Sequence, residues 1–109
     1  MSEAAATSPL DNHALEPLWR EVLGRRLRVI RQEHEQTLAE TAGRAGISPQ
    51  YLSEVERGRK EPSSEMIAAL AGALGTTLID LTEQVAGDLR RQVHAASPRA
   101  AFTPLALAA

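Results

Sequence analysis

The stretch "TLAETAGRAGISPQYLSEVERG", residues 37–58, contains two short helix patterns with a turn between them. In the first pattern, Thr37 occupies an N-cap position and Glu40 follows three residues later. This is the spacing of a capping box, in which each side chain bonds the backbone N–H of the other residue. We therefore predict a helix from Leu38 to about Ala45. Gly46 ends it, because glycine readily adopts the left-handed conformation that closes a helix.

The second helix pattern begins at Ser48, a favoured N-cap residue, with Pro49 at the first helical position. It predicts a helix from Pro49 to about Arg57, stopped by Gly58. The two helices are each about two turns long, and the four residues "AGIS" that join them carry glycine at the second position. This arrangement is typical of a helix-turn-helix motif.

Helices are also predicted on both sides of this pair. Pro17 opens the first, at about residues 17–34, whose apolar stripe recurs at spacings of four and three. After Pro62, Ser63 caps another helix that runs to Gly75. The inward residues of these two helices are Leu23, Leu27 and Ile30, and Ile67, Leu70, Ala71 and Leu74. The sequence thus predicts an all-α domain over residues 17–82.

A fifth helix opens at a second capping box, formed by Thr77 and Asp80. Its apolar stripe continues to Val93, past the point where a five-helix core would close. We assign residues 83–94 to this C-terminal extension and predict that it forms a homodimer. The predicted dimer residues are Val85, Leu89 and Val93. In the alternative, the stripe folds back on the first helix, against Trp19.

Composition limits what kind of protein this is. The chain has 109 residues and no cysteine, which excludes disulfides, Cys-ligated zinc and thiol catalysis. Three aromatic residues leave an aliphatic core, rich in helix formers. There is no signal-peptide pattern and no apolar run of membrane-spanning length, so we expect a soluble cytoplasmic protein with no membrane partner. Residues 1–16 and 95–109 are predicted to be disordered or flexible.

Charge is distributed unevenly along the chain. The formal net charge is −2, but residues 25–60 hold eight basic and five acidic residues, a local charge of +3. A basic segment within an acidic chain is a weak indication of a polyanionic partner.

The helix predicted from Pro49 has a polar outer side. With Leu52 turned inward, Gln50, Glu54 and Arg57 cluster on the opposite side, and Ser53 lies at its edge. The DNA major groove accepts one helix, where Gln pairs with adenine, Arg with guanine and Glu with cytosine. We therefore predict base readout by this helix. The alternative is an ordinary solvated face of a helical bundle.

Backbone phosphates are the expected partners of the residues around this face. Arg57, Arg59 and Lys60 follow the groove-facing turns and would position the helix without reading sequence. Thr37 and Leu38, at the positive N-terminus of their helix, would add backbone N–H contacts. The alternative for any one of these arginines is an ordinary solubilising surface charge.

Residues 23–82 resemble the Cro/CI-type helix-turn-helix regulators, a five-helix, lambda-repressor-like family. The segment from "LGRRLRVIRQE" to "AALAGALGTTL" looks closer still to the bacterial Clp protease gene regulators, most specifically in "YLSEVERGRKEPSSE". The resemblance implies that Ser48, Pro49, Gln50, Ser53 and Glu54 lie at the groove, with Tyr51 near a phosphate. It also implies that Glu56 pairs with an arginine of the first helix, which by spacing is Arg31.

The same resemblance implies an activator of Clp protease genes in a stress response, with double-stranded DNA and RNA polymerase as partners and no cofactor or metal. Thr41 and Gly43 depart from the family pattern, so we expect local loosening of their helix. The ending "LALAA" is similar to the bacterial trans-translation degradation tag. It suggests a degron at Leu107, Ala108 and Ala109 that Clp protease would recognise.

Other classes of function fit less well. The three histidines are scattered, and Glu54 and Glu56 are two residues apart, which points them to different helix faces. We therefore do not expect an enzyme. A protein-interaction module, such as an antitoxin, or an autoregulatory repressor stays open as an alternative.

Overall fold

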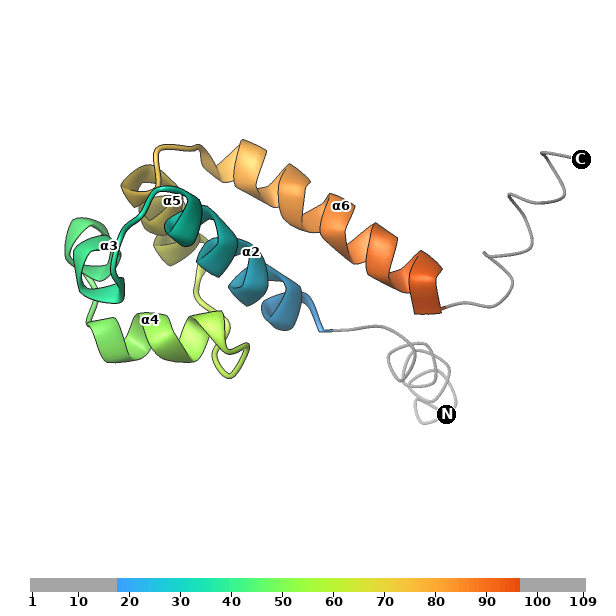
Figure 1. Cartoon of the computed structure of the whole chain (residues 1–109), viewed down its shortest axis with the longest axis horizontal. Helices are drawn as coiled ribbons and strands as arrows, with labels where there is room; N and C mark the ends of the chain where they lie inside the picture. Colours follow the sequence, from blue (N-terminus) through green and yellow to red (C-terminus); the bar gives the residue numbers. More distant parts are fainter. Residues whose placement is uncertain (1–17, 97–109) are drawn as a thin grey trace, which may run out of the picture.

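The computed structural model describes residues 18–96 as five α-helices, with no strand in that range (Figure 1). Labels follow Figure 1: α2 Trp19–Glu33, α3 Leu38–Ala45, α4 Pro49–Glu56, α5 Ser64–Ala73 and α6 Leu78–Ala96. The predicted all-α, five-helix architecture is confirmed.

Local capping signals place the helix ends close to their predicted positions. The Thr37 N–H donates to Glu40 Oε1 at 2.8 Å and Thr37 Oγ1 accepts from the Glu40 N–H at 3.0 Å, so the capping box is formed. Ser48 Oγ accepts from the Tyr51 N–H at 3.0 Å. α4 ends one residue before its predicted end, and α6 extends three residues beyond Val93.

Some predictions concern residues outside the described range. Pro17, the predicted start of the first helix, is one of them, and α2 begins at Trp19 with Leu18 as its N-cap. The predicted disorder of residues 1–16 and the candidate degron at Leu107, Ala108 and Ala109 also lie outside it. Residues 95 and 96, assigned to a flexible tail, form the last turn of α6.

The core is aliphatic, as the composition predicts. Its fully buried large apolar side chains come from α2, α4, α5 with its C-cap residue, and α6: Val22, Leu23, Leu27, Leu52, Val55, Leu70, Leu74, Leu81 and Val85. α3 contributes Ala42 and Thr41, whose hydroxyl donates to Gln36 Oε1 at 2.6 Å. α3 runs unbroken from Leu38 to Ala45, and the local loosening expected around Thr41 and Gly43 stays a prediction.

α6 packs against α2, and this corrects one of the predicted dimer residues (Figure 1). Val85 is 0% exposed within the single chain, so it is a core residue and cannot meet a partner. For Val85 the alternative was right, since its side of α6 faces the chain's own core. Leu89 packs against that core but is only half-buried, so its role in a dimer stays a prediction. Val93 is half-buried.

Polar contacts fasten the second half of α6 to α2. Arg26 donates from Nε and Nη2 to the two carboxylate oxygens of Asp88, both at 2.7 Å. Arg91 also pairs with Asp88, and Arg25 Nη2 donates to Gln92 Oε1 at 2.8 Å. These contacts were not predicted. They hold the two helices side by side beyond the apolar core.

None of the helices in residues 18–96 is by itself both long and apolar enough to cross a bilayer, and α5 and α6 meet those criteria only as a pair bent by 100°.

Candidate nucleic-acid interface

α4 rests directly on the backbone of α2 at Gly24. A Cβ atom at that position would lie 2.4 Å from the carbonyl oxygen of Val55 and 2.6 Å from that of Glu56. Only glycine permits this approach, so Gly24 sets the distance between the two helices. The sequence analysis missed Gly24, although a glycine inside an amphipathic helix pattern is a recognised sign of close packing.

A second contact holds the end of α4. Gly58 follows the helix with φ of 77°, the left-handed conformation, and its carbonyl oxygen accepts from Arg20 Nε at 3.0 Å. The C-terminal end of α4 is therefore bound to the first turn of α2.

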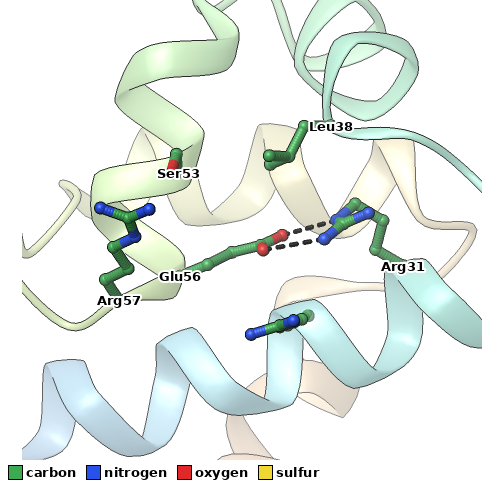
Figure 2. A pocket seen from close by; sticks show the side chains of 6 residues that line it. Arg31, Leu38, Ser53, Glu56 and Arg57 are labelled. Atoms are coloured by element: carbon green, nitrogen blue, oxygen red, sulfur yellow. Dashed lines mark hydrogen bonds and ion pairs between the residues drawn. The ribbon is translucent and has the colours of Figure 1, made fainter.

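The Arg31–Glu56 ion pair is present and confirms the prediction. Arg31 Nε donates to Glu56 Oε2 at 2.7 Å and Nη2 donates to Oε1 at 3.0 Å, which makes the pair bidentate. The side chains are only 12% and 7% exposed. The hydrogen bonds to Glu56 raise the pKa of Arg31 above its ordinary value, since they stabilise its charged form. Figure 2 shows the two side chains meeting between α2 and α4.

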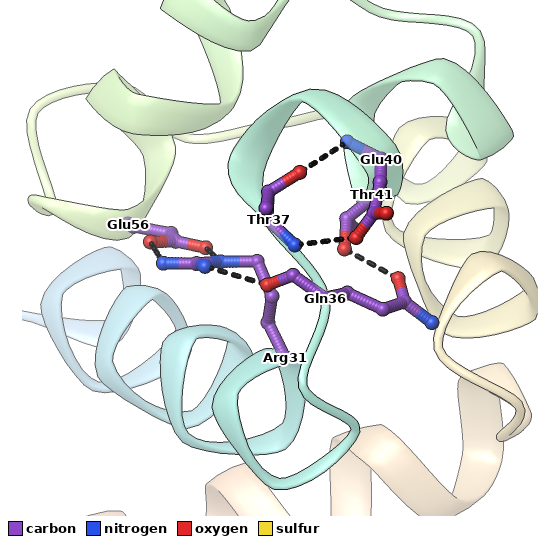
Figure 3. Close-up of polar contacts among 6 residues, drawn as sticks. All are labelled: Arg31, Gln36, Thr37, Glu40, Thr41 and Glu56. Atoms are coloured by element: carbon purple, nitrogen blue, oxygen red, sulfur yellow. Dashed lines mark hydrogen bonds and ion pairs between the residues drawn. The ribbon is translucent and has the colours of Figure 1, made fainter.

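Arg31 also reaches the turn before α3. Its Nη1 donates to the Gln36 carbonyl oxygen at 2.9 Å, and the Gln36 side chain accepts from Thr41 (Figure 3). One guanidinium therefore joins α2, the turn before α3 and α4. Within residues 18–96, no buried side-chain polar atom lacks a hydrogen-bond partner.

The opposite side of α4 carries the predicted base-reading residues. Leu52 and Val55 are 1% and 0% exposed and turn into the core, so the polar positions face outward. Ser48, Pro49 and Gln50 are exposed, and Ser53 and Glu54 are half-buried. No side-chain hydrogen bond within the described residues engages Gln50, Ser53 or Glu54 as donor or acceptor. The helix thus presents polar side chains that are not committed to the fold.

Of the residues predicted to contact phosphates, some are exposed and others are half-buried or already hydrogen-bonded within the fold. Arg57, Arg59 and Lys60 are exposed at the end of α4 and in the turn after it. Tyr51, in contrast, is half-buried against the core. The Thr37 N–H is already bonded to Glu40, so a phosphate contact through that amide would require breaking the capping box. Leu38 is the next residue of the helix N-terminus.

A polar hollow of about 220 Å³ opens beside the outer face of α4 (Figure 2). It is lined by Arg28, Arg31, Leu38, Ser53, Glu56 and Arg57. Because Arg31 and Glu56 neutralise each other, the exposed arginines Arg28 and Arg57 leave the hollow net positive. Arg28 was not among the predicted interface residues, because α2 was expected to serve only as core. Its position adds a cation from α2 to the candidate interface.

In the part of the chain that the structure describes, no three His, Asp or Glu side chains come together in a group that could hold a metal ion. The arrangement is instead suited to a polyanion. A polar helix face is flanked by exposed cations, and the ion pair behind it fixes its position.

Comparison with known proteins identifies the architecture. The family described as "Helix-turn-helix domain" matches residues 22–85. The transcriptional regulator ClgR of Mycobacterium tuberculosis is 48% identical over 73 residues, which cover 63% of this chain and 65% of the regulator. The chain therefore spans less than two thirds of the length of this curated relative. Such relatives are regulators of transcription, in agreement with the prediction that the chain is not an enzyme.

Solved structures give the same result. The crystal structure of the clp gene regulator ClgR from Corynebacterium glutamicum has a TM-score of 0.68 and 44% identity, over 85% of this chain and 92% of that chain. The restriction-modification controller protein C.Esp1396I, a tetramer in complex with its natural 35 base-pair operator, has a TM-score of 0.62. It is 16% identical over 68% of this chain and 97% of its own, and so shows likeness of fold alone.

Proposed function

This chain belongs to the helix-turn-helix domain family, and on that premise we propose that it is a cytoplasmic, sequence-specific DNA-binding regulator of transcription. It reads the major groove with α4, as a homodimer on a two-fold operator. The observation that carries the proposal is that the two sides of α4 have different roles. Its inner side is held by Gly24 and Arg31, while its outer side carries polar side chains that the fold does not use.

Base recognition falls to the outer face of α4. Gln50, exposed in the first turn, pairs with adenine through its amide, and Glu54 accepts from cytosine N4. Ser48, Pro49 and Ser53 complete the face. A carboxylate such as Glu54 would be repelled by phosphates, so its presence on this face favours a role at a base edge.

Phosphate contacts hold α4 in its groove. Arg57, Arg59 and Lys60 lie beyond its C-terminal end, and Leu38 lies at the N-terminus of α3. The hollow next to Ser53 adds Arg28, so that one phosphate is bound between Arg28 of α2 and Arg57 after α4. These contacts fix the register of the protein on DNA and carry no sequence information themselves.

The regulon is inferred from the relatives. Similarity to the transcriptional regulator ClgR and to the clp gene regulator ClgR of Corynebacterium glutamicum supports control of Clp protease genes. Activation, with RNA polymerase as partner, is our proposal. In vitro transcription from a clp promoter tests whether the protein activates or represses. If the protein is an activator, adding it increases the amount of transcript. A decrease would make the protein a repressor instead.

The C-terminal residues Leu107, Ala108 and Ala109 form, in this proposal, a degron for Clp protease. Replacing Ala108 and Ala109 with Asp is expected to lengthen the half-life of the protein in cells. An unchanged half-life would remove the degron and leave DNA binding unaffected.

DNA binding is tested by titrating the protein against a duplex from a clp promoter and a scrambled duplex, at two salt concentrations. We expect tight promoter binding that weakens steeply with salt, because cations on DNA are released. Gln50→Ala is expected to lose about tenfold in preference for the promoter. Gln84→Ala, which removes an exposed glutamine of α6, is the matched control and leaves the preference intact.

Arg28→Gln separates phosphate binding from base readout in the same titration. It is expected to weaken binding to both duplexes by a similar factor. Weak binding of the unaltered protein to both duplexes, insensitive to salt, would contradict the proposal. It would favour a protein-interaction module of the antitoxin type.

A further inference from the structure

Within residues 18–96, Thr41 is the only polar side chain in the buried core, with 1% of its surface exposed. Its hydroxyl donates to Gln36 Oε1 at 2.6 Å, so the half-buried Gln36 side chain reaches from the turn before α3 to the middle of that helix (Figure 3). A buried hydroxyl without a partner costs free energy, so the packing of α3 depends on this bond. The bond therefore ties the position of α3 to that of Gln36.

The backbone of Gln36 is in turn bound to Arg31 of α2. The Gln36 N–H donates to the Arg31 carbonyl oxygen at 3.1 Å, and the Gln36 carbonyl oxygen accepts from Arg31 Nη1 at 2.9 Å. The same guanidinium makes the bidentate pair with Glu56 at the end of α4. Together with the bond from Thr41, these contacts join the middle of α3 to the last turn of α4 without passing through the turn that connects the two helices.

The backbone immediately before Gln36 is strained. Glu35 has a φ of 56°, in the left-handed region, and among residues 18–96 it is the only residue other than glycine with a positive φ. Such a conformation persists only where the surrounding structure determines it. The three hydrogen bonds of Gln36 supply that constraint, so the turn before α3 is held in one conformation.

We propose that Gln36 and Thr41 are positioning residues for DNA binding, which set the angle between α3 and α4. The inference rests on the proposed function, in which α4 reads bases while the N-terminus of α3 contacts a phosphate. A sequence-specific complex needs both contacts at once, because phosphate contacts fix the register in which the base edges are read. A change in the angle leaves each contact possible alone but prevents the two from forming together on one duplex.

Three variants of the full chain separate positioning from stability. Thr41→Val has nearly the same shape without the hydroxyl, so the bond to Gln36 is lost. Thr41→Ser keeps the hydroxyl and loses a methyl group instead. The double variant Q36L/T41V also lacks the bond, but it leaves neither polar partner stranded, so we expect it to recover part of the stability lost in Thr41→Val.

Promoter preference is measured as the dissociation constant for the scrambled duplex divided by that for the clp promoter duplex. We expect this ratio to fall by about fivefold in Thr41→Val and in Q36L/T41V, and to stay within about twofold of the original in Thr41→Ser. Val85→Ala, which removes buried apolar atoms of α6, is the matched control: it lowers stability and leaves the ratio unchanged. Urea denaturation of every variant measures stability alongside.

The angle itself is measured without DNA, from residual dipolar couplings of the backbone amides of α3 and α4. We expect it to change in Thr41→Val and in Q36L/T41V, and to stay the same in Thr41→Ser. An unchanged angle in Thr41→Val would overturn the inference, and so would a promoter preference that merely follows stability across the variants. If the unaltered protein prefers neither duplex, the proposed function fails and the role in DNA binding falls with it, while the couplings show separately whether the Gln36–Thr41 bond sets the angle.

Discussion

Gly24 is the residue at which a single added methyl group has the largest expected effect. In Gly24→Ala the new Cβ would lie 2.4 Å from the Val55 carbonyl oxygen, which belongs to helix backbone and cannot rotate away. α4 must shift from α2, and we expect the free energy of unfolding to fall by about 3 kcal/mol. Urea denaturation followed by circular dichroism measures this loss.

Gly43→Ala is the matched control for that experiment. Gly43 also lies inside a helix, but a Cβ there would meet nothing within 4 Å. Alanine therefore removes only the entropic cost of a helical glycine, and we expect a gain of about 0.5–1 kcal/mol. If the two substitutions changed the free energy of unfolding equally, the close approach at Gly24 would not be the cause of the loss.

The Arg31–Glu56 pair gives a second prediction for single residues. Glu56→Ala leaves the largely buried Arg31 without a counter-charge, and we expect a loss of about 3–5 kcal/mol. In the double variant R31M/E56L no buried charge is stranded, so its stability should lie much closer to that of the original protein. A double variant as unstable as Glu56→Ala would assign the loss to packing.

Between helices, the Arg26–Asp88 contact predicts how stability depends on pH. Hydrogen bonds from Arg26 are the main cause that lowers the pKa of Asp88 below its ordinary value. Because the pKa of Asp88 is lower in the folded state, its charged form stabilises the fold at pH values above the pKa of the unfolded state, about 3.9. This stabilisation is lost as the pH falls through the pKa of the folded state.

Asp88→Asn is therefore expected to cost about 1–2 kcal/mol at pH 7, because the charged, bidentate contact is lost. The difference from the original protein should shrink as the pH falls below about 4. Thermal denaturation across this pH range measures it. Glu61→Gln, which changes an exposed carboxylate in the loop before α5, should show no such trend. A pH-independent deficit in Asp88→Asn would contradict the assigned role of the charge.

Individual elements differ in how far the sequence predicts them. The starts of α3 and α4 were predicted correctly, because their caps bond residues only three positions away. Gly24, Arg28 and the Arg26–Asp88 pair were missed, since their partners are far apart in sequence and meet only once the helices pack. Val85 was misassigned for the same reason. A periodic stripe shows which side of α6 is apolar, but not where the core it covers comes to an end.

At the scale of the whole molecule, a protein of net charge −2 is expected to bind a polyanion through its local cations. If Arg59 and Lys60 contact phosphates, replacing both with Gln should reduce the slope of log binding constant against log salt by about 1.8. Affinity for promoter and scrambled duplexes should fall together.

A variant with the same net charge controls for the overall field. Ala68→Glu combined with Gln84→Glu adds two negative charges at exposed positions of α5 and α6. Its salt slope should match that of the original protein. If both variants reduce the slope equally, Arg59 and Lys60 act through long-range charge and make no phosphate contact.

The contacts that hold α4 in the fold and the outer face of α4 depend on different side chains. Gly24, Arg31, Leu52, Val55 and Glu56 hold the helix, and none of them belongs to the proposed reading set. Gln50, Ser53 and Glu54 can therefore be replaced by other polar residues without changing the contacts that hold α4. Related proteins built on such a scaffold can diverge in the operators they recognise while the contacts that hold α4 stay the same. A laboratory library that varies these three positions among polar residues should keep the fold.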